Sequence, residues 1–349
     1  MKNVKTTIPT YLFLAVFGLA IVGILFGSIF DEQISLAIVN TTNPFGMLFE
    51  TVGFVANMLV PFAGAIVFKG LFGYKKISLK ILGVAVLAVS LGVGVYLYGK
   101  QIGTFDSDEI FYGFRIKETW LALLIAAVVS LAFAALGYFI ADASNKPGLI
   151  RVGTIILVAM LGHWVVMHFL KLVGGRPRFR FLTEGISVDV GGGGPGVYEG
   201  VTYEFQNWWE FAWFKAPKLD SFKSWPSGHT ACASITLCLG LLPSILKKRF
   251  KGDTYVFFGI GLAYTLTVAI ARIVIGAHFL SDVSTGMLVG SFAIWICSFL
   301  GEKLFMYEPK GWFFQRFGKQ GEDPQKKTEK TEEQDVPEEQ IASEETVNQ

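Results

Sequence analysis

Eight stretches of the chain are apolar enough to cross a membrane, and they restrict the possible folds more than any other feature. They cover residues 11–30, 49–68, 77–98, 119–141, 149–170, 230–246, 254–275 and 281–300. A helix needs roughly 20 apolar residues to cross a bilayer. Only 17% of the residues are charged, against about 25% in soluble proteins. We therefore predict an all-α polytopic membrane protein with about eight transmembrane helices.

The first apolar stretch follows Lys2 and Lys5, as the core of a signal peptide would. Its apolar core is long, however, and it ends in "GSIFDE" without a small-residue cleavage pattern. We therefore expect a retained helix. The segment 31–48 is too polar to cross, and we expect it at the membrane interface.

Basic residues between the apolar stretches predict the orientation of the chain. Loops 69–76 and 247–253 are rich in lysine and arginine, whereas segment 31–48 has acidic residues and no basic one. Because basic residues concentrate in cytoplasmic loops, both termini are expected in the cytoplasm. Segments 99–118, 171–229 and 276–280 then lie outside, and the pattern is typical of a bacterial plasma membrane protein.

The end of the chain differs from the membrane domain, which we expect over residues 1–300. Residues 301–317 mix basic and aromatic side chains, as juxtamembrane segments do. Residues 318–349 contain ten acidic residues, four lysines and no aromatic residue, which predicts a disordered acidic cytoplasmic tail. The three cysteines fall within predicted spans, which favours packing over disulfide formation; they are Cys232, Cys238 and Cys297.

Polar residues gather in three segments that the predicted topology places at the same membrane face. The first, "KLVGGRPRFR" (171–180), contains Lys171, Arg176, Arg178 and Arg180. Basic residues are unexpected on the outer side, and the glycines and proline favour a fixed turn. The segment therefore indicates anion binding, with contacts to lipid headgroups as the alternative.

The second segment, "PSGH" (226–229), stands at the start of the sixth apolar stretch. Backbone N–H groups at a helix start lack partners and carry the positive end of the helix dipole. With the Ser227 hydroxyl they could hold a phosphate beside His229. An ordinary helix cap is the alternative.

The third segment, "ARIVIGAHFLSD" (271–282), contains Arg272, His278 and Asp282. His278 and Asp282 are four residues apart and share a helix face. The carboxylate could accept one ring N–H and make the other nitrogen more nucleophilic, although a purely structural pair is the alternative. Neither histidine has a second ligand at zinc-binding spacing, so the three segments together favour phosphoryl transfer.

These segments resemble the three motifs of the type 2 phosphatidic acid phosphatase superfamily, which are Lys-x6-Arg-Pro, Pro-Ser-Gly-His and Ser-Arg-x5-His-x3-Asp. All three spacings match. Phe179 replaces a usual proline and Ala271 replaces a usual serine. We expect weaker phosphate binding with activity retained. The resemblance implies a six-helix core, so 77–98 and 119–141 would be two extra spans.

The resemblance also implies a role for each matching residue. His278 is the expected nucleophile that forms a phosphohistidine, Asp282 orients it, and His229 acts as general acid and then as base. The expected phosphate ligands are Lys171, Arg178, Ser227, Gly228 and Arg272. Arg176 is conjectured to contact a second phosphate. No metal or other cofactor is expected.

The implied function is a metal-independent lipid phosphate or diphosphate phosphatase at the outer membrane face. Undecaprenyl diphosphate, phosphatidylglycerophosphate and phosphatidic acid are candidate substrates. A phosphotransferase with an alcohol acceptor would use the same residues. A vanadate haloperoxidase is typically soluble, and a transporter would make the three segments coincidental. The bilayer and a membrane lipid phosphate are the expected partners, nucleic acid is not, and protein partners stay open.

Two further features carry weaker expectations. The outer loop 181–225 contains "GGGG" and "FQNWWEFAWF", which favours a lid on the membrane surface, with simple packing over the helices as the alternative. His163 and His168 lie in the fifth span. We expect His163 to be a packing residue. For His168, a supporting contact near the site stays open as an alternative to packing.

Overall fold

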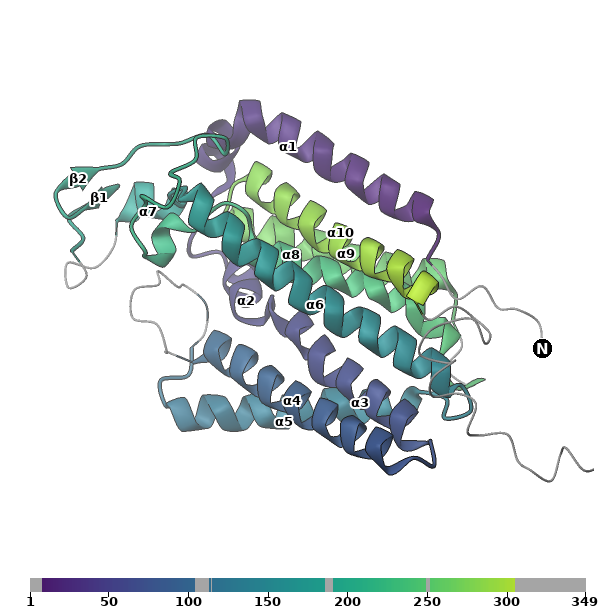
Figure 1. Ribbon diagram of the computed structural model, residues 1–349. Helices are drawn as coiled ribbons and strands as arrows, with labels where there is room; N and C mark the ends of the chain where they lie inside the picture. Colours follow the sequence, from purple (N-terminus) through teal and green to yellow (C-terminus); the bar gives the residue numbers. More distant parts are fainter. Residues whose placement is uncertain (1–7, 104–112, 114, 186–190, 249–251, 305–349) are drawn as a thin grey trace, which may run out of the picture. The chain divides into compact units, whose positions relative to one another are not determined.

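A computed structural model describes residues 8–103, 113, 115–185, 191–248 and 252–304, most of which are helical (Figure 1). Seven helical segments are long and apolar enough to cross a membrane, which confirms the predicted fold class. They are Thr10–Ile38, Pro44–Phe72, Ile77–Ile102, Thr119–Ile140, Lys146–Glu184, Thr254–Val274 and Leu280–Gly301. The predicted acidic tail and most of the predicted juxtamembrane segment lie outside the described residues.

The sixth predicted span differs from the others because it is built from two short helices. Helix α8 (Gly228–Ser234) continues into the 3₁₀ helix η4 (Ile235–Ser244), and neither is long enough to count among the seven. A 3₁₀ helix rises about 2.0 Å per residue against about 1.5 Å in an α-helix. The two helices together therefore reach roughly 30 Å, which is the thickness of the hydrocarbon core.

The first helix is longer than predicted. Helix α1 (Thr10–Ile38) continues into the segment expected at the interface, and Asp31 is only 3% exposed. Asp31 accepts hydrogen bonds from the backbone and hydroxyl of Ser281 and from Arg176. These buried partners compensate the carboxylate for the loss of water, so the acidic residue does not end the helix.

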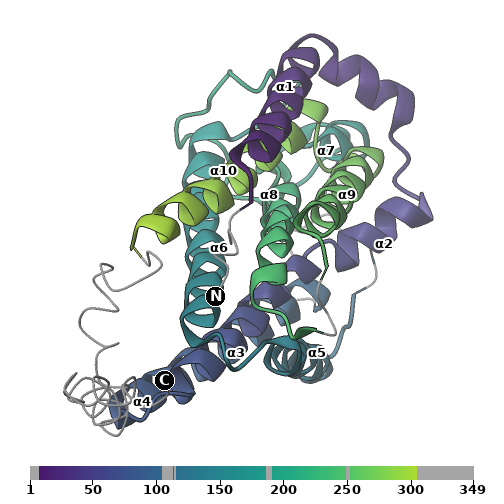
Figure 2. The same cartoon turned by 90° about the vertical axis from the view of Figure 1, so that its right-hand side faces the viewer.

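Helix α3 (Leu59–Phe72) organises the other spans around it. Helices α4 (Ile77–Ile102), α5 (Thr119–Ile140) and α6 (Lys146–Gly174) all pack on α3. Helix α9 (Thr254–Val274) packs on α8, η4 and the short helix α2 (Pro44–Val52). Figure 2 shows α4 and α5 on the α3 side, with α8, α9 and α10 (Leu280–Leu304) on the other.

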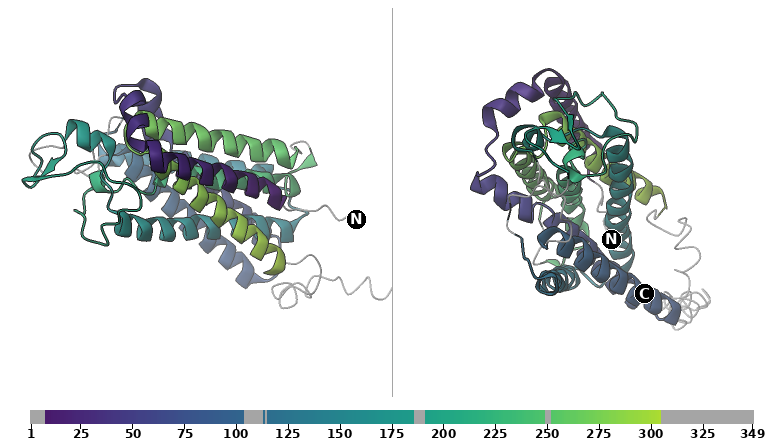
Figure 3. Two further views of the ribbon diagram at one scale, coloured as in Figure 1. Left: turned by 90° about the horizontal axis from the view of Figure 1, so that it is seen from above. Right: turned by 90° about the vertical axis from the view of Figure 1, so that its left-hand side faces the viewer.

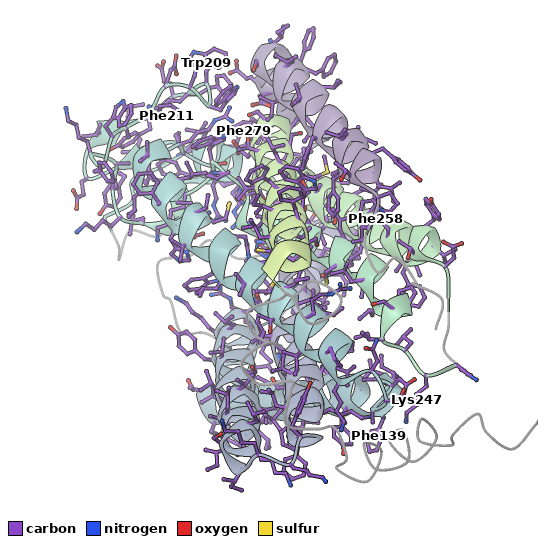
Figure 4. All side chains as sticks on the ribbon, turned by 45° about the vertical axis from the view of Figure 1, so that its right-hand side comes forward. Phe139, Trp209, Phe211, Lys247, Phe258 and Phe279 are labelled. Carbon is purple, nitrogen blue, oxygen red and sulfur yellow. The ribbon has the colours of Figure 1, made fainter. Side chains whose placement is uncertain are left out.

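The two ends of the bundle carry different segments. At one end Lys69 donates to the carbonyl of Ala141, Asp142 donates its N–H to the carbonyl of Ile245, and the short basic connections meet there. The opposite end carries the short helix α7 (Phe179–Glu184) and a hairpin of β1 (Val197–Tyr198) and β2 (Val201–Thr202) (Figure 3). In Figure 4, Trp209, Phe211 and Phe279 lie at this end, whereas Phe139 and Lys247 lie at the other.

The aromatic part of the outer loop packs over the helices. The N–H groups of Ala212, Trp213 and Phe214 donate to the last carbonyls of α6. Trp208 donates its ring N–H to Ser28 at 2.8 Å and stacks on Trp225. The loop therefore packs over the helices, which is the alternative to a lid that the sequence left open. The side chains of Trp213 and Phe214 are nevertheless 61% exposed.

Candidate active site

The predicted site residues converge on a cavity of about 250 Å³ at the loop end of the bundle. Five of them line it: Lys171, Arg178, Gly228, His229 and His278. They come from α6, the turn after it, the start of α8 and the turn between α9 and α10. Ser227, Arg272 and Asp282 are fully buried and lie outside its lining.

His278 is held in one tautomer by the backbone. Its Nδ1 lies 2.6 Å from the carbonyl oxygen of Ser224. Because a carbonyl only accepts, Nδ1 carries the proton and Nε2 keeps the lone pair. Burial, and then the charges of Arg178 and Arg272, lower the pKa of His278 well below its ordinary value. The ring is therefore neutral at physiological pH, which a nucleophile requires.

Asp282 does not form the predicted hydrogen bond with the His278 ring. Its Oδ2 is 3.9 Å from His278 Nδ1. It accepts instead from the Ser224 hydroxyl at 2.5 Å and from the N–H of Phe279 at 2.8 Å. The second contact closes the start of α10, as in a capping box. Asp282 is therefore linked to His278 only through Ser224, whose side chain binds Asp282 and whose carbonyl holds the imidazole.

Arg178 and Lys171 bring positive charge to the cavity. Lys171 Nζ donates to the carbonyl of Lys223 at 2.7 Å. Arg178 Nη2 lies 2.6 Å from Asp220 Oδ2. Arg178 Nε and Nη1 are buried, and neither finds a hydrogen-bond partner among the described residues. Such buried donors cost about 1–3 kcal/mol each, and an anion in the cavity would satisfy them.

The start of α8 places Gly228 and His229 in the cavity wall. Ser227 caps the helix, since its hydroxyl oxygen accepts the N–H of Thr230 at 3.4 Å. Ser227 also donates its own N–H to the carbonyl of Asp282. Its hydroxyl thus serves as an ordinary helix cap, which was the alternative at the sequence level. Its predicted phosphate contact stays a prediction.

His229 contacts segments far away in the sequence. Its ring packs on Phe54, with 3.8 Å between the ring centroids. Its Nε2 lies 3.5 Å from the amide nitrogen of Gln101, which also donates to the carbonyl of Glu50. Gln101 belongs to α4, so one of the two spans regarded as extra contributes to the surroundings of the predicted general acid.

Arg272 shares a buried carboxylate with Arg180. Glu50 Oε1 lies 3.2 Å from Arg272 Nη1 and 2.5 Å from Arg180 Nη1. All three side chains are inaccessible to solvent. Arg272 is still close enough for its charge to lower the pKa of His278, and its predicted contact with phosphate stays a prediction.

Arg176 lies in a buried network rather than in the cavity. Its Nη1 is 2.7 Å from Asp282 Oδ1 and 3.1 Å from Asp31 Oδ2. Its Nε donates to the carbonyl of Gln206, and its guanidinium covers the ring of Phe279 at 3.9 Å. The two carboxylates already balance its charge, so the placement argues against the conjectured contact with a second phosphate.

Several supporting residues were missed by sequence reasoning. The sequence could have indicated Asp31 and Glu50, because an isolated acidic residue in or beside an apolar stretch is energetically unfavourable unless it has a partner. It could not have indicated Ser224, Gln101 and Asp220, because their roles depend on contacts between distant segments.

Two glycines of α10 allow α8 to approach closely. A Cβ at Gly286 would lie 2.4 Å from the carbonyl oxygen of Ser227, and one at Gly290 would lie 2.1 Å from that of Ala231. Glycines four residues apart let membrane helices pack with their backbones in contact. This packing fixes the distance between the segment that carries His229 and the segment that carries His278.

We expect Gly286→Ala to reduce activity by at least about tenfold, since displacing catalytic groups by about 1 Å can cost 10²-fold. Gly162→Ala is the matched control, because a Cβ at Gly162 meets nothing within 4 Å. Phosphate release by both purified variants checks this. Equal activity in the two would show that the α8–α10 contact does not set the site geometry.

The comparison with known protein families agrees with this geometry. Residues 152–305, from α6 to the end of α10, match the model of the PAP2 superfamily. This segment belongs to the PAP2 superfamily. It contains all three motifs and every residue predicted for the site, and PAP2 membership indicates a phosphatase at the level of the family. No curated protein and no solved structure matches the chain.

Within the described residues, no group of three or more His, Cys, Asp or Glu side chains could hold a metal ion. The three cysteines are unpaired thiols. Basic side chains, together with the carboxylate of Asp220, line the cavity that contains the two histidines.

Proposed function

We propose that the protein is a lipid phosphate phosphatase that works through a phosphohistidine on His278. The observation that carries the proposal is the state of this ring in the cavity. Its Nδ1 is fixed by the Ser224 carbonyl, and Nε2 keeps a lone pair next to the cationic groups Arg178 and Lys171.

The reaction has two steps on this arrangement. Nε2 of His278 attacks phosphorus, the bond to the leaving oxygen breaks, and His229 gives that oxygen a proton. His229 then takes a proton from water, whose oxygen attacks phosphorus and releases orthophosphate from His278. Arg178, Lys171 and Arg272 offset the negative charge on the phosphoryl oxygens in both steps.

The membrane setting favours a phosphate or diphosphate monoester on a lipid as the substrate. We further propose that the site faces away from the cytoplasm. The basic connections that carry Lys69, Lys146 and Lys247 meet at the opposite end of the bundle, and such residues favour the cytoplasmic side.

Phosphate release from a panel of polyprenyl and glycerolipid phosphates tests the function. The purified protein in detergent is expected to release phosphate equally with and without EDTA, because the cationic side chains take the place of a metal. Loss of release in EDTA would contradict the metal-independent mechanism. Release only when an alcohol acceptor is present would instead identify a phosphotransferase.

A further inference from the structure

We propose that an apolar groove between α4 and α6 holds the hydrocarbon chain of the substrate, so that α4 selects the lipid. The inference rests on the proposed function and adds the chain-binding site. The groove has a volume of about 630 Å³ and is lined almost entirely by apolar side chains, including Val89 and Val93 of α4 and Leu161 of α6. Val60 of α3 belongs to it as well.

The groove adjoins the cationic cavity. Tyr96, Leu97 and Trp164 line both. A molecule with an anionic head and an apolar chain could therefore place its phosphate beside His278 and its chain between the two helices. This junction favours the substrate's own chain as the occupant over an unrelated membrane lipid.

Helix α4 is firmly placed for this role. It packs on α3 at Gly64, where a Cβ would lie 2.4 Å from the side chain of Ser90. At its other end, Gln101 reaches the ring of His229. One helix thus forms a wall of the groove and contacts the predicted general acid.

The α4 wall comes from outside the part of the chain that matches the PAP2 model. That match begins at residue 152, whereas α4 ends at Ile102. Only the α6 wall lies within the matched segment. The position of α4 therefore gives this chain a lipid-contacting surface that the matched segment alone does not supply.

The surrounding lipid is as apolar as the groove, so the hydrocarbon chain is not removed from water when it enters the groove. The groove can therefore select a substrate only by how well the chain fits into it. A bulky side chain in the groove should therefore exclude a long chain and leave the chemistry intact. Val89 is suited to this test because it lines the groove and is 65% exposed, so a larger residue does not disturb the packed core.

The experiment compares hexadecyl phosphate with butyl phosphate as substrates of Val89→Trp in one detergent. We expect kcat/KM for hexadecyl phosphate to fall by about tenfold or more through KM, as when a hydrophobic pocket rejects a substrate. Butyl phosphate, which is too short to occupy the groove, should be hydrolysed as by the unmodified protein. Val84→Trp is the matched control, since Val84 is 51% exposed on the same helix and lies outside the groove.

Leu161→Trp repeats the test from α6, so the result does not depend on how α4 tolerates tryptophan. Its control is Val165→Trp, which is 61% exposed and lies outside the groove. An unchanged ratio of the two kcat/KM values in both groove variants would overturn the inference and leave the phosphatase function standing. Failure of the unmodified protein to hydrolyse either substrate would overturn the proposed function, and this inference with it.

Discussion

Replacing His278 by alanine is expected to lower phosphate release by about 10⁴-fold or more, because loss of an enzyme nucleophile has effects of this size. In the proposed mechanism the imidazole forms the bond to phosphorus, with Nδ1 held by the Ser224 carbonyl and Nε2 left with its lone pair. The variant should still bind the lipid phosphate, since Arg178 and Lys171 keep their positions. Initial rates of phosphate release from the best lipid substrate measure the effect.

His168→Ala is the matched control for this substitution. His168 also lines the cavity, but its ring stacks on Trp164 and its Nδ1 lies 2.9 Å from the carbonyl of the same residue. Its loss should change the rate by only a few-fold, as expected for a side chain without a part in the chemistry. If His278→Ala keeps the rate of the unmodified protein and the same thermal midpoint, the phosphohistidine mechanism is wrong.

Among the proposed substitutions, Arg176→Ala should destabilise the protein most. It is expected to lower the free energy of unfolding by about 3–5 kcal/mol, as is typical when one partner of a buried ion pair is removed. The substitution leaves Asp31 and Asp282 buried without their shared cation. Asp282 would then hold Ser224, and through it His278, less firmly. Activity should fall together with stability.

Arg178→Ala, two residues away, provides the contrast. Arg178 pairs with Asp220, whose side chain is 25% exposed and can be hydrated when the partner is lost. We expect this variant to keep most of its stability and to lose kcat/KM. The thermal midpoint and kcat/KM of both variants distinguish the roles. A stable Arg176→Ala protein with a raised KM would restore the conjectured phosphate contact and contradict the structural role.

The sequence by itself determined the spans and the residues that meet at the site. Long apolar stretches have few alternatives to crossing a membrane as helices, and seven of the eight predicted spans are long helices. The three motif segments were also placed at one end of the bundle, because the number of crossings between them fixes the side on which each emerges. Neither conclusion needs knowledge of side-chain contacts.

Only the tertiary structure decided which partners the charged residues take. Sequence spacing paired His278 with Asp282, but the imidazole bonds the carbonyl of Ser224, which lies more than fifty residues earlier. The sequence suggested Arg176 as a possible phosphate ligand, whereas in the structure it forms an ion pair with Asp31 on the first helix. A charge inside a membrane protein must find a compensating group, and the chain can supply that group from any helix that packs nearby. Helical periodicity describes neighbours on one helix, whereas these pairings depend on how separate helices pack together.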